Sequence, residues 1–498
     1  MLSPLTVAMA CVCWLLSLFA LARWAQRYPP AFARHWWLIY GLSLAIHCTS
    51  WTFYGTVTQA ARSGWWIPPT FIGAILLYTL GLPLMRRLVD LGRRTHATSV
   101  ADLIATRLGK SAPLAAVVTL VMVIGMVPYI ALQLRAVSGS FSVLMSGNVA
   151  ARSSAWYADI SLYGALAMAL FAMAFGTREA NASAHNRGMV VAIAFESLFK
   201  LMAMLLVGIV VIGGAESIPD AAQTLPERST LGFGPLIILG AMAMFVQPHQ
   251  FHMAVVEARD ERDTVKARWV LPAYLALIAL PILPIALIGL SGPLASTVAP
   301  DLFVLALPLH AGHDGVALLA FLGGLGAATG MVVVSVLSLS LMIINHWVSP
   351  SVLRGSWWTR PDGDLRRDVV LARRAAVLVV MALSWAFARA IDNNAVLADV
   401  GALSFSAMVP VVPVLLLALW RPQVAPQAAC IGIVAGLLVW AWLVLLPNVM
   451  RVPAFPSAIE WLHPNVWFGL NSWSPLGRGL ATSLLVSYGL TIGLSGRF

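Results

Sequence analysis

The chain has 498 residues, of which 60% are hydrophobic and only 10% are charged. This composition excludes a soluble globule with a polar surface and predicts an all-α protein that crosses a lipid bilayer many times. The formal net charge of +11 does not indicate a nucleic-acid partner, because the basic residues form no patch with interleaved aromatic side chains.

Thirteen stretches are apolar over about 20 residues, which is the length that an α-helix needs to cross a membrane. They predict a single membrane domain over residues 1–498. The first stretch is too long, and its flank too poor in charge, to be a cleaved signal peptide, so we expect a membrane anchor. The predicted spans are 3–23, 36–58, 66–86, 113–136, 157–175, 188–213, 232–255, 269–291, 315–345, 371–391, 398–420, 427–446 and 476–494.

The basic residues predict the orientation of the chain. Of 31 Lys and Arg residues, 22 lie in alternate connections between the predicted spans and seven lie in the other set. Because cytoplasmic loops carry an excess of Lys and Arg, we expect the N-terminus outside and the C-terminus in the cytoplasm. The four cysteines lie within predicted spans at no metal-ligand spacing, so neither a disulfide nor a zinc site is predicted.

Two connections have patterns of their own. Residues 95–110 predict a short cytoplasmic helix, with Ser99 as its N-cap, Asp102 three residues later and Gly109 as its stop. The connection 257–269 alternates in charge, and we expect it to be solvated.

The first polar cluster lies in the stretch SLAIHCTSWTFYGTV, residues 43–57. Its polar side chains point around the whole circumference of a helix, which one protein-facing stripe cannot accommodate. We therefore expect a local break in the helix, whose free carbonyls line a cavity. For His47 a structural role and a role in binding solute or protons both stay open. The polar residues are His47, Cys48, Thr49, Ser50, Thr52 and Tyr54.

The second polar cluster is FVQPHQFH, residues 245–252, where Pro248 kinks or ends the helix. It lies five spans after the first cluster, and an odd number of spans places two repeats in opposite orientations. This pattern predicts an inverted five-plus-five repeat, as in secondary transporters whose site lies between the repeats. We expect repeat one over 36–213 and repeat two over 232–420, with extra spans at 3–23 and within 427–494.

Other polar residues within the spans allow two interpretations each. Glu196 and Lys200, one helical turn apart, form either a buried ion pair that holds helices together or part of an ion or proton relay. The small residues of 323–345 favour close helix packing, although Thr329 beside Gly330 also suits a small cation.

Two further segments, around residues 129–138 and 401–410, carry polar side chains. Tyr129 and Gln133 share a helical face, and they contact either a polar solute or a neighbouring helix through a satisfied hydrogen bond. Ser404 and Ser406 allow the same two interpretations. No nucleophile elbow, HExxH motif or pair of catalytic carboxylates is present, so we do not expect an enzyme.

These residues resemble the sodium:solute symporter superfamily over roughly residues 5–445. The narrower likeness, carried by CTSWTFYG, TSVADLIATRLGK, PYIALQLRAVS, AIAFESLFKL, FLGGLGAATGMV and GALSFSAMVP, is to the symporter-like input domain of CbrA-type sensor histidine kinases. Together with the thirteen predicted spans, the resemblance leads us to expect an all-α protein of the inner membrane of a bacterium, with the LeuT-type inverted repeat preceded by one extra N-terminal span. It also implies a solute such as histidine and coupling to a cytoplasmic histidine kinase.

The resemblance further implies a coupling ion. The family's sodium site would use the carbonyls of Ala45 and Cys48 together with two hydroxyl residues, which fall here on Thr329 and Gly330. Because Gly330 has no hydroxyl, and because an acidic position of several sodium symporters falls on His47, Na+ and H+ both remain open as coupling ions. The acidic position of the fifth core helix is retained as Glu196.

The sequence therefore predicts a symporter that moves a small polar solute, such as an amino acid, across the bilayer without a further cofactor. The alternative is a solute-sensing input module, because the given sequence ends at Phe498 without a kinase region. The predicted solute-binding residues are His47, Ser50, Trp51, Tyr54, Tyr129, Gln133, Gln247, His249, Gln250 and Ser404. The predicted ion-coupling residues are Ala45, Cys48, Glu196, Thr329 and Gly330.

Overall fold

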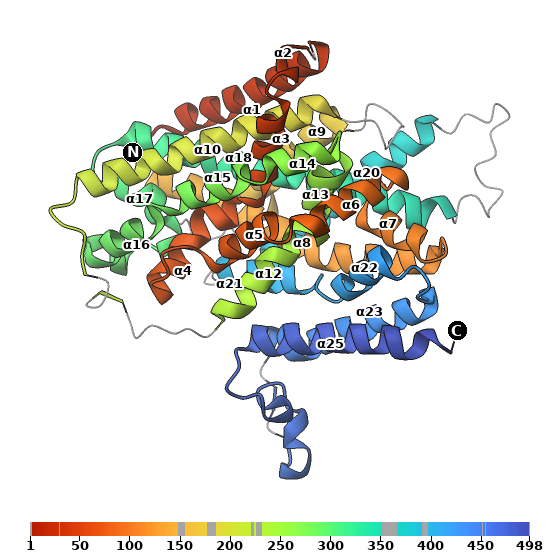
Figure 1. The fold of residues 1–498 in the computed structure, drawn as a ribbon. Helices are drawn as coiled ribbons and strands as arrows, with labels where there is room; N and C mark the ends of the chain where they lie inside the picture. Colours follow the sequence, from red (N-terminus) through yellow and green to blue (C-terminus); the bar gives the residue numbers. More distant parts are fainter. Residues whose placement is uncertain are drawn as a thin grey trace.

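The computed structural model describes residues 2–28, 30–147, 155–176, 186–220, 224–225, 232–350, 366–390, 397–450, 452–453 and 455–497. Within these ranges the regular structure is entirely helical, as predicted. Figure 1 shows the helices gathered into one bundle, with a helical pair along one edge.

The described residues include seven helices that are long and apolar enough to cross a membrane, or up to nine if each of two bent pairs counts as one span. The bent pairs are Pro69–Thr79 with Leu82–Arg94, at 71°, and Asp399–Ser406 with Val411–Trp420, at 44°. Four shorter apolar helices accompany them. The chain is thus a multi-pass membrane protein, and the number of thirteen spans and their inverted repeat stay predictions. The seven are Pro4–Arg27, Ala112–Ser146, Arg187–Gly213, Glu261–Ser291, Asp314–Val348, Arg367–Ala390 and Pro426–Val449.

The first half of the chain contains two long helices, α8 and α10, and one interrupted helix between residues 36 and 63. The interruption divides this helix into α3, the 3₁₀ turn η1, the π-helical turn η2 and α4. The elements are α1 (Pro4–Arg27), α2 (Pro30–Ala33), α3 (Trp36–Ser43), η1 (Leu44–His47), η2 (Trp51–Gly55), α4 (Thr56–Ser63), α5 (Pro69–Thr79), α6 (Leu82–Arg94), α7 (Val100–Arg107), α8 (Ala112–Ser146), η3 (Trp156–Ala158), α9 (Ile160–Gly176) and α10 (Arg187–Gly213).

The second half also contains an interrupted helix, between residues 233 and 256, together with the long helices α18 and α20. Its elements are α12 (Phe233–Val246), α13 (Pro248–Phe251), η4 (His252–Val256), α14 (Glu261–Ala267), α15 (Val270–Ala279), α16 (Ile282–Ser291), η5 (Pro293–Ser296), η6 (Pro300–Leu302), α17 (Phe303–His310), α18 (Asp314–Ile343), η7 (Ile344–Val348), α20 (Arg366–Ala390), α21 (Leu397–Ser406), α22 (Val411–Trp420), α23 (Pro426–Trp440), η9 (Ala441–Leu445), α24 (Leu446–Val449), η10 (Ser457–Leu462), η11 (Trp467–Gly469) and α25 (Pro475–Ser495).

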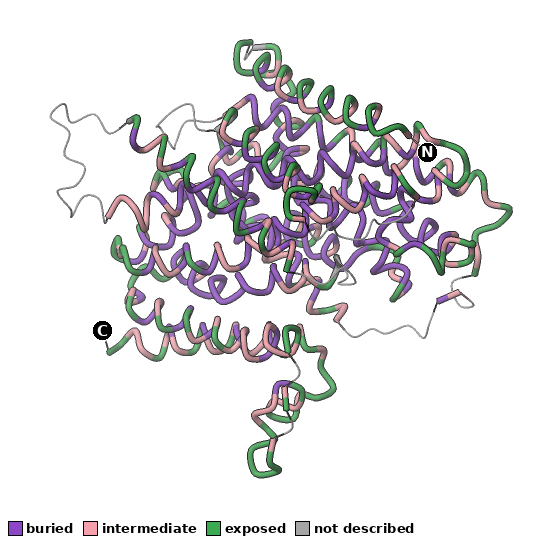
Figure 2. The backbone as a smooth tube through the Cα atoms, turned by 180° about the vertical axis from the view of Figure 1, so that it is seen from behind, coloured by how far each residue is buried: buried purple, intermediate pink, exposed green. Residues whose placement is uncertain are grey.

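The helix α18 is the centre of the bundle, with 94% of its apolar stretch buried inside the protein. It packs against α8, α9, α10 and α20. Figure 2 shows the buried backbone concentrated in the interior of the bundle. Close approach is possible because several glycines stand where a Cβ atom would collide with a neighbour. At Gly324 that neighbour is the hydroxyl of Tyr54, and at Gly326 it is the side chains of Glu196 and Trp14.

Two peripheral features complete the fold. The predicted short helix is confirmed as α7, where the Ser99 side chain accepts a hydrogen bond from the Asp102 N–H and Gly109 follows with φ +79°. The helices α23 and α25 pack against each other along one edge, and the segment between them projects beyond the bundle (Figure 1).

Candidate functional site

The first helix break lies where the polar cluster predicted it. The 3₁₀ turn η1 ends at His47, Cys48 leaves the helical region with φ −80° and ψ 84°, and the chain resumes as a π-helical turn from Trp51. The ordinary helical ladder of hydrogen bonds is therefore interrupted at membrane depth, which is tolerated only where protein or a cavity surrounds the backbone.

The second break lies at the predicted proline. The helix α12 ends at Val246, Gln247 is extended with φ −62° and ψ 134°, and Pro248 starts the short helix α13. Pro248 has no N–H to donate, so a helix can begin there but cannot pass through without losing a hydrogen bond. A π-helical turn, η4, then follows from His252.

The two breaks lie next to each other. The turn η1 packs against α13, and His249 lies within electrostatic reach of His47. An aromatic group closes one side: the ring of Phe405 in α21 lies 5.0 Å from that of Trp51 and 4.6 Å from that of Tyr129. The ring of Tyr129 also stacks on that of His249 at 6.1 Å. Segments about 200 residues apart in sequence thus form one buried centre.

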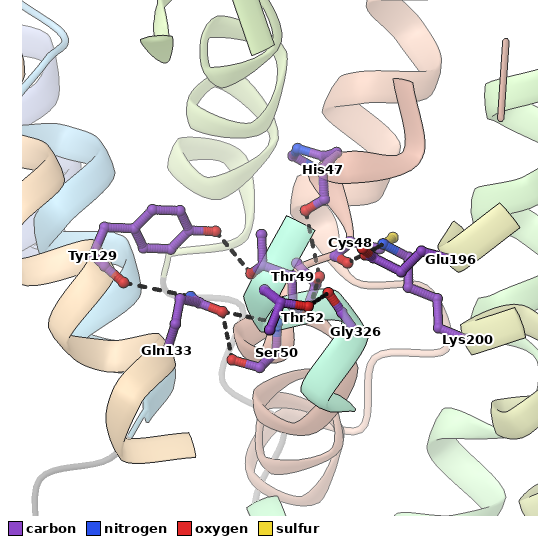
Figure 3. A network of polar contacts seen from close by, with 11 residues as sticks. His47, Cys48, Thr49, Ser50, Thr52, Tyr129, Gln133, Glu196, Lys200 and Gly326 are labelled. Atoms are coloured by element: carbon purple, nitrogen blue, oxygen red, sulfur yellow. Dashed lines mark hydrogen bonds and ion pairs between the residues drawn. The ribbon is translucent and has the colours of Figure 1, made fainter. Parts of the chain in front are cut away.

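The helix α8 fastens the first break (Figure 3). The hydroxyls of Tyr129 and Thr49 lie 2.9 Å apart, and the Gln133 side-chain oxygen accepts hydrogen bonds from the backbone N–H of Ser50 at 3.0 Å and from its hydroxyl at 2.5 Å. In this conformation the interhelical bond that we considered for Tyr129 and Gln133 is present. Their predicted contact with solute stays a prediction.

A second group of polar side chains at the breaks is buried and has no hydrogen-bond partner within the described part of the protein. A buried polar atom without a partner costs about 1–3 kcal/mol, so a cluster of such atoms in one place is a candidate ligand site. Each of these side chains is at most 2% exposed. They are His47, Trp51, Tyr54, Gln247, His249 and Gln250, all of them predicted solute-binding residues.

The predicted residue Ser404 differs from this group. Its hydroxyl donates a hydrogen bond to the Val400 carbonyl within its own helix at 2.8 Å. Ser406 likewise donates to Leu403 and accepts from the indole N–H of Trp440 at 2.8 Å. Sequence reasoning missed Phe405 between them, because an aromatic residue in an apolar helix has no distinguishing pattern.

On the other side of the first break lie Glu196 and Lys200 of α10 (Figure 3). Both are buried, and the Lys200 Nζ lies 3.6 Å from Glu196 Oε1. The ammonium donates a shorter hydrogen bond, of 2.7 Å, to the backbone carbonyl of Cys48. The pair therefore does not act within α10 alone, because Lys200 also contacts the backbone of the first break.

The residues of the predicted sodium site have other partners. The Ala45 carbonyl accepts a hydrogen bond from the Cys48 N–H at 2.9 Å, and the Thr329 hydroxyl donates to Gly326 within its helix at 3.0 Å. A Cβ atom on Gly330 would collide with the Glu196 carboxylate, so the glycine makes room for that group. In the described ranges no cluster of three or more His, Cys, Asp and Glu residues suits a metal ion.

A crevice between helices also borders Glu196. It has a free volume of about 20 Å³ and is lined by α1, α9, α10 and α18, including Met189, Ile193, Thr329 and Gly330. A volume of this size accommodates about one water molecule.

Further contacts lie towards the two predicted ends of the helices. At the end that we predict to be outside, Arg62 and Asp399 form an ion pair at 3.2 Å, and Thr58 donates a hydrogen bond to buried Asp301. At the predicted cytoplasmic end the Arg259 guanidinium lies 3.3 Å above the centre of the Trp36 ring.

A second contact at the predicted cytoplasmic end joins α7 to η7, where His346 Nε2 lies 3.0 Å from Asp102 Oδ1. Burial raises the pKa of Asp102, but the interactions with His346 and Thr98 outweigh it, so that the pKa is lowered overall.

Glu257 was not singled out, because it lies in the connection that we expected to be solvated, yet it is only 1% exposed. Its carboxylate accepts hydrogen bonds from the Asn186 N–H at the start of α10 and lies 3.4 Å from His252. The expectation of a solvated connection is wrong at this residue, because the carboxylate joins η4 to α10.

No protein-family model matches the sequence, and no curated protein matches it either. Solved structures match the fold. A Na+-coupled sialic acid symporter, in a substrate-bound outward-open state, aligns with a TM-score of 0.65 and 13% sequence identity, over 99% of this chain and 97% of that chain. The Eremococcus coleocola manganese transporter aligns with a TM-score of 0.50 and 14% identity, over 92% of each chain. The protein thus has the fold of membrane transporters.

Proposed function

We propose that the protein is a secondary active transporter, a symporter that moves a small polar solute across a bacterial inner membrane together with Na+ or H+. One observation carries the proposal: two interrupted helices meet at buried polar side chains that have no partner within the described protein. Interrupted helices at membrane depth are how transporters expose backbone and side-chain groups to a substrate.

The chemistry of the unpartnered group suits an amino acid. His47, His249, Gln247 and Gln250 supply both hydrogen-bond donors and acceptors, while Trp51 adds an indole N–H and a flat apolar surface. A zwitterion with a polar side chain can use both kinds of group. The resemblance to histidine-associated input domains makes histidine our first candidate.

In this proposal the outer and inner contacts open in turn. Release of the Arg62–Asp399 pair would admit solute from outside, and release of Arg259 from Trp36 would let it leave into the cytoplasm. The fastening of the first break to α8 through Gln133 would hold the site together while either end opens.

Uptake into proteoliposomes tests this function. Labelled histidine, with a panel of other amino acids, is offered under an imposed Na+ gradient or an imposed pH gradient. Accumulation of one solute above the level in protein-free vesicles is expected. Glu196→Gln is expected to abolish the accumulation, whereas Glu216→Gln, at an exposed position, is expected to leave it unchanged.

Binding without accumulation under either gradient would refute transport. That result would favour the alternative that the chain senses its solute for a cytoplasmic histidine kinase. Wild-type uptake in correctly inserted Glu196→Gln and Thr329→Val variants would instead refute the assignment of the ion-coupling residues.

A further inference from the structure

We propose that a groove between α12, α22 and α25 binds one anionic glycerophospholipid, with an acyl chain against its apolar walls and the phosphate at Arg421. The groove has a free volume of about 450 Å³. Its walls are formed mainly by leucine, valine, methionine and proline side chains, and among the described residues that line it Arg421 is the only charged one. The inference is independent of the transported solute and of the site between the helix breaks.

The groove follows one face of α22. Val412, Leu416 and Trp420 recur every four residues, so they form a continuous stripe along this helix. From Val412 to Trp420 the helix rises by about 12 Å, because each residue adds about 1.5 Å. One leaflet of the hydrocarbon core is about 15 Å thick, which is half of the whole. The groove therefore extends over most of the depth that an acyl chain occupies in one leaflet.

The groove opens outward, away from the centre of the bundle. Its residue Leu485 on α25 is 70% exposed, and Trp420 and Tyr488 are exposed as well. The helix α25 lies along the edge of the bundle (Figure 1). Outward-facing apolar side chains of a membrane-spanning helix contact lipid. The molecule that surrounds this face is therefore a lipid, and the groove gives one lipid a defined place.

Positive charge is concentrated where the groove ends. Arg421 directly follows α22. The Arg87 guanidinium of α6 donates two hydrogen bonds, of 3.0 and 2.7 Å, to the Leu419 carbonyl, and Arg107 of α7 donates one of 3.1 Å to the Ala418 carbonyl. Within the described ranges no carboxylate pairs with any of these three guanidinium groups. Charge complementarity thus favours an anionic headgroup over a neutral one at this end.

The carboxyl end of a helix normally repels an anion, because its last carbonyls carry partial negative charge. Here Arg87 and Arg107 bind two of those carbonyls and compensate their charge. The side chain of Arg421 has no hydrogen bond or ion pair with another described residue. A guanidinium can bind two phosphate oxygens at once, so Arg421 is suited to hold a phosphate.

Two aromatic side chains of the groove lie towards the same end. The helices α22 and α25 are predicted to run in the same direction across the membrane, so Trp420 and Tyr488 both lie nearer the predicted cytoplasmic surface than the leucines of the groove. Trp and Tyr prefer the boundary between acyl chains and headgroups, where the ring is apolar and the N–H or O–H donates a hydrogen bond. The order of apolar, amphipathic and charged groups along the groove is therefore the order of groups along a phospholipid.

A lipid in this groove would join three helices that are distant in sequence. The helix α12 leads into the second break, and α22 follows α21, which carries Phe405. The described structure already packs α12 against both α22 and α25. A ligand that binds the folded protein stabilises it, so the bound lipid should raise the unfolding midpoint.

Lipid binding to the purified full-length protein is measured by native mass spectrometry, and the unfolding midpoint is measured in parallel. Dioleoyl phosphatidylglycerol is the anionic probe and dioleoyl phosphatidylcholine, with the same acyl chains, is the neutral one. We expect the wild type to bind its tightest phosphatidylglycerol about 5-fold more strongly than phosphatidylcholine, which is the effect of about 1 kcal/mol per arginine near a membrane surface. Arg421→Gln should remove this preference, whereas Arg262→Gln, at an exposed arginine of the same predicted face, should keep it.

A second pair of variants tests the apolar walls. Leu484→Trp fills the groove and should weaken phosphatidylglycerol binding by about 5-fold or more, whereas Leu438→Trp, on the exposed face of α23, should not. Equal affinity of the wild type for both lipids, or a preference that survives in Arg421→Gln, overturns the proposal. A dimer that Leu484→Trp dissociates would show that a second copy covers the groove and would overturn it as well. No solute is used, so failure here is distinct from failure of the uptake experiment.

Discussion

Replacement of Gln133 by leucine tests whether α8 fastens the first break. The side-chain oxygen of Gln133 is the acceptor for two buried donors of Ser50, its N–H and its hydroxyl. Leucine accepts no hydrogen bond, so both donors lose their partner in a site where every group concerned is 0% exposed. Each unsatisfied buried donor costs about 1–3 kcal/mol, and the hydroxyl can turn towards another acceptor, so we expect a loss of about 2–4 kcal/mol.

Ser50→Ala is the matched comparison, because it removes only the hydroxyl and leaves the hydrogen bond from the backbone N–H intact. We expect it to cost about 0.5–1.5 kcal/mol. For a chain of this length a loss of 1 kcal/mol lowers the unfolding midpoint by roughly 1 °C. The unfolding midpoint should therefore be lowest for Gln133→Leu, higher for Ser50→Ala and highest for the wild type.

The assay is thermal unfolding of the detergent-solubilised protein, followed by tryptophan fluorescence, with Gln423→Leu at an exposed position as a control. The reasoning is refuted if Ser50→Ala lowers the midpoint as much as Gln133→Leu does. It is also refuted if Gln133→Leu is no more harmful than the control.

Three other predictions concern the site and its surroundings. His249→Gln should weaken binding of the transported solute by roughly 10- to 100-fold in an equilibrium-binding assay, because about 1–3 kcal/mol of hydrogen bonding is lost. His313→Gln, at an exposed position, should have no effect in the same assay. Gly330→Ala should lower the free energy of unfolding by about 1–3 kcal/mol, because its Cβ atom collides with the Glu196 carboxylate. Gly164→Ala, whose Cβ atom meets no neighbour within 4 Å, should not lower it. Midpoints from thermal unfolding check both variants. Asp102 has a lowered pKa in the folded protein, so the stability it contributes is present at neutral pH and is lost as the pH falls below about 4. Asp102→Asn should therefore flatten the acid side of a plot of the unfolding midpoint against pH. An unchanged slope would contradict this prediction.

The sequence was sufficient to predict both helix breaks. Polar side chains on every face of residues 47–54 cannot all meet protein in an unbroken membrane helix, and Pro248 removes a donor from the second helix. These are local constraints, and local constraints are visible in a sequence. The short helix after Ser99 was predictable for the same reason.

The partners of those breaks were not predictable. Gln133 and Ser50 are 83 residues apart, and nothing in either segment indicates that one amide oxygen serves both donors of one serine. The spacing of Glu196 and Lys200 predicted an ion pair along one helix, but the shorter contact of Lys200 is with a backbone carbonyl of another helix. A backbone carbonyl has no residue type, so no sequence pattern indicates it.

Exposure was misjudged where charge was taken as a sign of solvent. Glu257 lies among Arg and Asp residues, which is typical of a solvated connection. The fold turns this one carboxylate inward to accept hydrogen bonds from the N–H of Asn186, the N-cap residue of α10. Such choices depend on which helix start lies nearby, and that is a property of the tertiary structure.

The most direct test of the central claim is the location of the solute. A cryo-electron microscopy structure of the full chain in lipid nanodiscs, prepared with and without the amino acid that accumulates in vesicles, gives this location. The account predicts solute density between the two breaks, in contact with His249 and Gln247 on one side and Trp51 on the other. Density at any other place, with both breaks unchanged, would contradict it.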